Sequence, residues 1–135
     1  MALVSAKEGA TRLEALVSGL LFVSESDAPL RVVQLGPSPD LDAPTLLHAL
    51  GKPLTTPISE QPLGALFDRA TSEQSWHGPA ERATVERYRA LTRFLSSELE
   101  SPRVFRIGQI VVEAYALGRA SDGAWLGVAT TLIET

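Results

Sequence analysis

The sequence predicts an α/β (α+β) fold, a three-layer α/β/α sandwich in which helices cover both faces of a mostly antiparallel sheet of about four strands. Two segments repeat apolar residues at spacings of three and four, which is the pattern of amphipathic helices. Near the end, three strand-like segments follow one another by short connections, which favour antiparallel pairing. Adjacent apolar residues in these strands place apolar side chains on both faces, so both need a cover. We expect one domain spanning residues 1–135.

The first helix is predicted in the segment AKEGATRLEALVSGLLF, residues 6–22, with Gly19 as its terminator. A polar turn at residues 24–29, SESDAP, follows this helix. The branched residues of RVVQL, residues 31–35, then predict a short strand.

Prolines divide the middle of the chain, so the apolar pieces at residues 45–50 and 62–70 are predicted to be short helices. The clearest helix is predicted over residues 79–99, because Pro79 suits a first helical position and the apolar spacing is regular. After Pro102 the pattern changes to that of strands. These strands are predicted in VFRIG (104–108), IVVEAYALG (110–118) and WLGVATTLIE (125–134), with a hairpin turn at Ser121–Gly123.

The sequence ends in a strand-like segment that is followed at once by Glu134 and Thr135, with no polar tail. Chain ends are usually loose unless packing ties them down. We therefore expect an acid and a hydroxyl to be held rigidly at the end of a packed strand.

Composition excludes several classes of protein. The chain contains no cysteine, which excludes disulfides, thiolate catalysis and cysteine-based zinc sites. Its net charge of −4 argues against direct binding of nucleic acid, which needs basic surface, and suits a basic protein partner. The longest apolar stretch is too short to cross a membrane and lacks the basic start of a signal peptide. We expect a soluble, cytoplasmic, acidic protein.

No sequence motif indicates an enzyme. His48 and His77 lie far apart and form no metal-binding spacing, and phosphate-binding or nucleophile motifs are absent from the sequence. Glu25 and Asp27 are paired acids within a turn, where acids commonly serve as turn formers. A small enzyme using Glu25, Asp27 and a histidine stays as an alternative that the sequence does not favour.

Three features suggest a binding surface instead. Glu25 lies between two serines in a turn that follows an apolar run, so a short anchored loop would hold it. Trp76 lies in a polar loop before the long helix, where it either folds back on the core or serves as an interface residue. The third feature is the terminal pair, Glu134 and Thr135.

These features coincide with those of one family. The sequence resembles the nuclease A inhibitors, small proteins that block sugar-nonspecific nucleases of the ββα-metal superfamily. The resemblance covers nearly the whole chain and is carried by separated segments. These are GLLFVSESDAP near the start, the loop ATSEQSW, SPRVFRIGQIVVEAYALG, and LGVATTLIET at the end.

The resemblance implies roles for particular residues. Glu25 would enter the nuclease active site and stand in for the charge of the scissile phosphate. Thr135 would place its hydroxyl on the catalytic Mg²⁺ of the nuclease, so the inhibitor would need no cofactor or metal of its own. Trp76 would form a second contact patch, in which Ser75 stands where family members can carry an acid. Possible additional contacts are Ser24, Ser26 and Glu134.

The resemblance thus predicts a protein inhibitor, not an enzyme, that acts by substrate mimicry and a metal bridge. It would block a Mg²⁺-dependent DNA/RNA endonuclease as a monomer in a one-to-one complex. The departure at Ser75 keeps an alternative open, in which the chain is a protein–protein interaction module of the same fold with a partner that is not a nuclease.

Overall fold

A computed structural model of the protein describes residues 3–134, so Thr135 lies outside the described residues. The described chain contains four α-helices and seven β-strands. The helices are α1 (Ala6–Val17), α2 (Ala43–Ala49), α3 (Leu63–Phe67) and α4 (Pro79–Ser97). The strands are β1 (Leu21–Val23), β2 (Asp27–Pro29), β3 (Arg31–Pro37), β4 (Ile58–Gln61), β5 (Glu100–Ile107), β6 (Val111–Arg119) and β7 (Ala124–Ile133).

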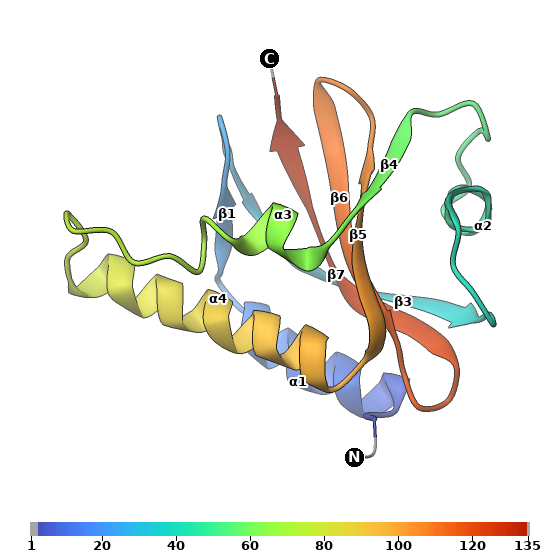
Figure 1. Cartoon of the computed structure of the whole chain (residues 1–135), viewed down its shortest axis with the longest axis horizontal. Coiled ribbons are helices and arrows are strands. Elements are labelled where there is room, and N and C mark those ends of the chain that lie inside the picture. The colour runs from blue at the N-terminus through green and yellow to red at the C-terminus, as the bar shows by residue number, and fades with distance from the viewer. Residues whose placement is uncertain (1–2, 135) are drawn as a thin grey trace.

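Five strands form one antiparallel sheet in the order β3-β7-β6-β5-β4, and β1 and β2 pair separately as a hairpin (Figure 1). The antiparallel sheet and the three strands at the end of the chain confirm the sequence prediction. The sheet has five strands instead of about four, because β4 was not predicted, and the separate β1–β2 hairpin was not predicted either. β4 has only four residues between two prolines, which is too short a segment to show an alternating pattern.

The first strand of the hairpin is hidden in the sequence, because its three residues continue the apolar run of the preceding helix. α1 ends at Val17, and Gly19 adopts a left-handed conformation with φ of 71° that stops the helix. Gly19 therefore terminates the helix as predicted, and the apolar residues Leu21–Val23 that follow form β1.

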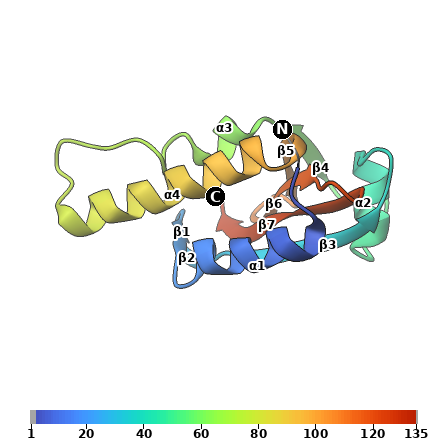
Figure 2. The same cartoon turned by 90° about the horizontal axis from the view of Figure 1, so that it is seen from below.

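Helices lie on both faces of the sheet, as predicted, but they cover the faces unequally (Figure 2). The first face packs against α1, α3 and α4, and its core includes Leu13, Phe67 and Leu95. The second face packs against α2 and the segment before it, through Leu46, Leu47 and other buried residues. A seven-residue helix covers only part of a sheet face, so the expected three-layer sandwich is incomplete on this side.

Three chain segments reach the same end of the molecule. Figure 1 shows the β1–β2 hairpin, the end of β7 and the β5–β6 connection at the top of the view, while the described start of the chain lies at the bottom. The segment between α3 and α4 projects on the side away from α2, in both Figure 1 and Figure 2. The fold therefore places the turn that carries Glu25 at the same end of the molecule as Glu134, and the segment that carries Trp76 apart from both.

Candidate binding site

The turn of the β1–β2 hairpin holds Glu25 in an exposed position. The N–H of Ser24 donates to the carbonyl of Ser26 at 2.9 Å, which closes the turn around Glu25. The Ser24 hydroxyl adds a second closure, since it donates to the same carbonyl at 3.2 Å and accepts from the Ser26 N–H at 3.4 Å. The backbone N–H and hydroxyl of Ser24 and the backbone N–H and carbonyl of Ser26 thus fix the conformation of the turn that carries Glu25.

The base of the hairpin is anchored to α4 by one aromatic cluster. Phe22 lies edge-on to the rings of Phe67 and Tyr88, with centroid separations of 6.3 and 6.0 Å. The Tyr88 hydroxyl donates to the carbonyl of Leu21 at 2.6 Å. Burial raises the pKa of Tyr88 above its ordinary value, because the phenolate would lose hydration there. A neutral phenol therefore holds β1 in place.

The other side of the hairpin is fastened to β7. The hydroxyl of Thr130, which is a fully buried polar side chain, donates to the carbonyl of Pro29 at 3.0 Å. Further along, the N–H of Ile133 donates to the Ser24 hydroxyl at 3.2 Å. These two bonds run along the edge of β7 beyond the residues that pair with β3, so the hairpin continues the sheet edge on that side.

The end of β7 is held from its other side by β6 and β5. The N–H of Glu134 donates to the carbonyl of Ile110 at 2.8 Å, and the Glu134 carboxylate forms an ion pair with Arg106. Arg106 lies in β5 and is largely covered. We call Ser24, Glu25, Ser26, Ile133 and Glu134 the C-terminal tip, because the bond from Ile133 to Ser24 joins the turn at residues 24–26 to the end of β7, which leads directly to Glu134.

The C-terminal tip brings together the predicted acid, both of its serines and Glu134. Thr135 lies outside the described residues, so its predicted contact is not located. Sequence reasoning did not find Arg106. An arginine between the apolar residues Phe105 and Ile107 of a strand was the available signal, since such a side chain needs an acidic partner when it is covered.

Trp76 lies on the surface of the segment between α3 and α4, with 74% of its area exposed. Of the two alternatives that the sequence left open, the structure therefore favours the exposed side chain over one that folds back on the core. Its ring packs edge-on against His77 at a centroid separation of 4.4 Å. Ser75 beside it is also exposed.

Several bonds order the backbone around Trp76. The N–H of Gln74 donates to His77 Nδ1 at 3.0 Å, and Arg82 donates to the His77 carbonyl at 2.9 Å. The N–H of Gly78 donates to Glu81 at 3.1 Å, which caps α4. Thus His77 and the start of α4 hold an exposed tryptophan outward, in a segment that lies apart from the C-terminal tip (Figure 1).

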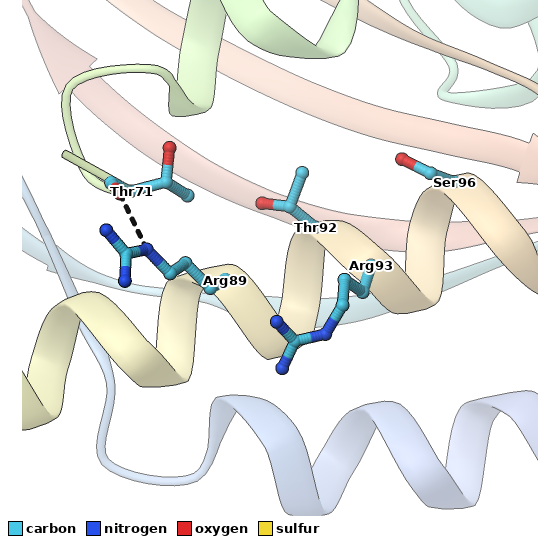
Figure 3. A pocket seen from close by; sticks show the side chains of 5 residues that line it. All are labelled: Thr71, Arg89, Thr92, Arg93 and Ser96. Carbon is cyan, nitrogen blue, oxygen red and sulfur yellow. Dashed lines mark hydrogen bonds between the residues drawn. The ribbon is translucent and has the colours of Figure 1, made fainter.

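The residues of the alternative enzyme reading lie in different elements. Asp27 lies in β2, His48 in α2 and His77 in the segment before α4. The hollows on the described surface include two that none of these residues line. Figure 3 shows the first, where Arg89 donates to the carbonyl of Thr71 at 3.0 Å. The second lies beside Arg103 on β5.

Within residues 3–134, no three side chains of His, Asp or Glu come together in a group able to hold a metal ion. None of the helices described has both the length and the apolar character needed to cross a bilayer.

These observations define an α+β domain that holds an acidic turn and the end of its last strand outward on an anchored tip. The family model of the nuclease A inhibitor-like proteins matches residues 7–135, and the chain belongs to this family. The resemblance seen in the sequence is thereby confirmed. Membership implies, in general terms, a role as a nuclease inhibitor with a nuclease as the partner. No curated protein matches the chain.

Proposed function

We propose that the protein inhibits a Mg²⁺-dependent, sugar-nonspecific DNA/RNA endonuclease of the ββα-metal type by occupying its active site. Glu25 takes the place of the scissile phosphate, and the Thr135 hydroxyl binds the Mg²⁺ that the nuclease holds. The observation that carries this proposal is the bond from the Ile133 N–H to the Ser24 hydroxyl. It fastens the acid-bearing turn to the strand that leads to Thr135.

The ligand preference of Mg²⁺, the anchoring of the C-terminal tip and the charge of Glu25 all support such a contact. Mg²⁺ prefers oxygen ligands and keeps exchangeable waters in nuclease sites, so a hydroxyl is able to replace one of them. A ligand delivered by an anchored strand loses little conformational entropy on binding. A nuclease cleft accepts polyanions, and it therefore attracts an exposed carboxylate such as that of Glu25.

Trp76 supplies the second contact patch, together with Ser75. Exposed tryptophan is the residue type most enriched among interface hot spots, and the bonds around His77 reduce the entropy lost when this one is buried. The complex contains one copy of each protein, and the inhibitor contributes neither a metal nor a cofactor. It acts in the cytoplasm, before the nuclease leaves the cell, and does not bind nucleic acid itself.

Titration of nuclease activity tests this function directly. The protein is added in increasing amounts to a panel of ββα-metal nucleases with DNA as substrate and Mg²⁺ in excess. We expect at least one enzyme to lose its activity at one equivalent of inhibitor, while a nuclease of an unrelated metal-site class is unaffected. Absence of inhibition across the panel would contradict the proposal. Isolation of a defined partner that is not a nuclease would then support the alternative interaction module.

A further inference from the structure

Exposed aliphatic side chains gather next to the C-terminal tip. Val23 is 71% exposed and directly precedes Ser24 in the hairpin. Ile110 is 63% exposed, and its carbonyl accepts the N–H of Glu134. Val111 is 58% exposed and lies opposite Ile133 in the ladder between β6 and β7. We call Val23, Ile110 and Val111 the aliphatic frame.

The aliphatic frame lies on both sides of the end of β7. The N–H groups of Ile133 and Glu134 point in opposite directions, the first to the hairpin and the second to Ile110. Val23 therefore lies on the hairpin side, whereas Ile110 and Val111 lie on the β6 side. Figure 1 shows this order, with β1, the end of β7 and the start of β6 next to one another at the top of the view.

Such a frame is costly in a free protein and useful in a complex. Exposed aliphatic area forgoes the stabilisation that its burial would provide. Threonine would maintain a strand at Val111 equally well, since branched residues of both kinds favour extended backbone. In an interface, apolar groups beside a polar contact exclude water. The lower dielectric then strengthens the charged interaction that they shield.

We propose that the aliphatic frame is a third contact surface for the nuclease and excludes water from the contact made by Glu25 and Thr135. The inference rests on the proposed function. Its occupant is the apolar border of the nuclease cleft that holds the metal. A partner that reaches Thr135 must also pass close to Ile110, because the residue before Thr135 is hydrogen-bonded to the Ile110 carbonyl.

Threonine substitutions test the frame with little change in backbone preference. The variants are Val23→Thr, Ile110→Thr and Val111→Thr, each titrated against the nuclease that the unsubstituted protein inhibits in the panel. The matched control is Leu54→Thr. Leu54 is 68% exposed and lies in the connection between α2 and β4, and β4 is separated from β7 by β6 and β5. Thermal melts verify that each variant is folded.

We expect Ile110→Thr and Val111→Thr each to raise the dissociation constant about tenfold, and Leu54→Thr to leave it unchanged. If the frame variants inhibit as well as the unsubstituted protein while Glu25→Gln weakens inhibition, the inference about the aliphatic frame is wrong and the proposed function stands. If no nuclease in the panel is inhibited at all, the proposed function fails, and the frame fails with it.

A measurement on the unsubstituted protein guards against variants that do not fold. Methyl NMR resonances of Ile110, Val111 and Val23 are followed while the nuclease is added. We expect these methyl groups to shift and to become protected from a soluble paramagnetic agent, while the methyl groups of Leu54 stay accessible. Unchanged accessibility of the three frame residues in a complex that is nevertheless inhibited would overturn the inference.

Discussion

The N–H of Ile133 donates a hydrogen bond of 3.2 Å to the hydroxyl of Ser24, a residue 109 positions earlier in the chain. The same hydroxyl closes the turn that carries Glu25 through its bonds to Ser26. Ser24 therefore sets the position of the turn relative to the end of β7. Its hydroxyl is occupied within the protein, which suggests a positioning role more than a direct contact with a partner.

Ser24→Ala should weaken inhibition about tenfold, because the turn and the end of β7 would no longer be fixed to one another. The loss of the bonds should also cost about 1 kcal/mol in the free energy of unfolding. Inhibitor titration measures the first effect and urea denaturation the second. Ser97→Ala is a suitable control, since the Ser97 hydroxyl makes a bond of the same kind to the Arg93 carbonyl in α4. Unchanged inhibition by Ser24→Ala would contradict the positioning role.

The elements with regular apolar patterns were predictable from the sequence. α1, α4 and the strands β5 to β7 show clear periodicities of helix or strand, and the structure confirms them. β4 and the hairpin strands are only three or four residues long, so no period is visible in them. The β1–β2 pair exists because the half-buried Phe22 packs against Tyr88 and because β7 offers an open edge, and both of these are tertiary effects.

The candidate binding site was predictable only in part. The turn around Glu25 and the exposed Trp76 were identified by residue type and by resemblance to a family. The couplings among them were not, because Ser24 and Ile133 or Arg106 and Glu134 meet only after the sheet has formed. Arg106 is an example, since one arginine within a strand of the sequence does not reveal which acid will pair with it in the fold.

Substitution of Thr135, the last residue of the sequence, tests whether its hydroxyl is the metal ligand. Thr135→Val keeps the shape and removes the oxygen, so it should weaken inhibition tenfold or more, whereas Thr135→Ser should keep most of the potency. Removal of Thr135 should be at least as damaging as the valine variant. Inhibition assays in Mg²⁺ measure all three variants. Full potency in the shortened chain would exclude the metal contact.

Glu25→Gln tests the charge at the turn, because glutamine preserves the shape of the side chain. We expect the dissociation constant to rise by about tenfold to a hundredfold, mainly through slower association. Salt screens charges over distances of about 8 to 10 Å at physiological ionic strength, so inhibition by the unsubstituted protein should weaken as salt rises. Stopped-flow association at several salt concentrations should show a flatter dependence for the variant. Equal salt slopes would argue against a steering role for Glu25.

Trp76→Ala tests the second contact patch independently of the C-terminal tip. The side chain is exposed, so the free energy of unfolding should change by less than about 0.5 kcal/mol. Affinity for the nuclease should fall by about 2 kcal/mol or more if Trp76 is a hot spot. Inhibition should still be complete at saturating concentration, since the tip is intact. Calorimetric titration measures the affinity, and an unchanged dissociation constant would remove Trp76 from the interface.

Tyr88→Phe tests the anchor of the hairpin through its dependence on pH. Burial raises the pKa of Tyr88 in the folded state, whereas in the unfolded chain it stays near its ordinary value of about 10. The folded state therefore binds this proton more tightly. The stability that the neutral phenol contributes is complete below about pH 10 and is lost as pH rises from there toward the folded-state pKa.

At neutral pH, Tyr88→Phe should be about 1 kcal/mol less stable, because the carbonyl of Leu21 loses its donor. As the pH rises above about 10, the free energy of unfolding should fall more steeply for the unsubstituted protein, so the two curves should converge. Urea denaturation at a series of alkaline pH values measures both curves. Parallel curves over this range would mean that Tyr88 ionises equally well in the folded and unfolded chains, and the buried phenol would then not be the anchor of β1.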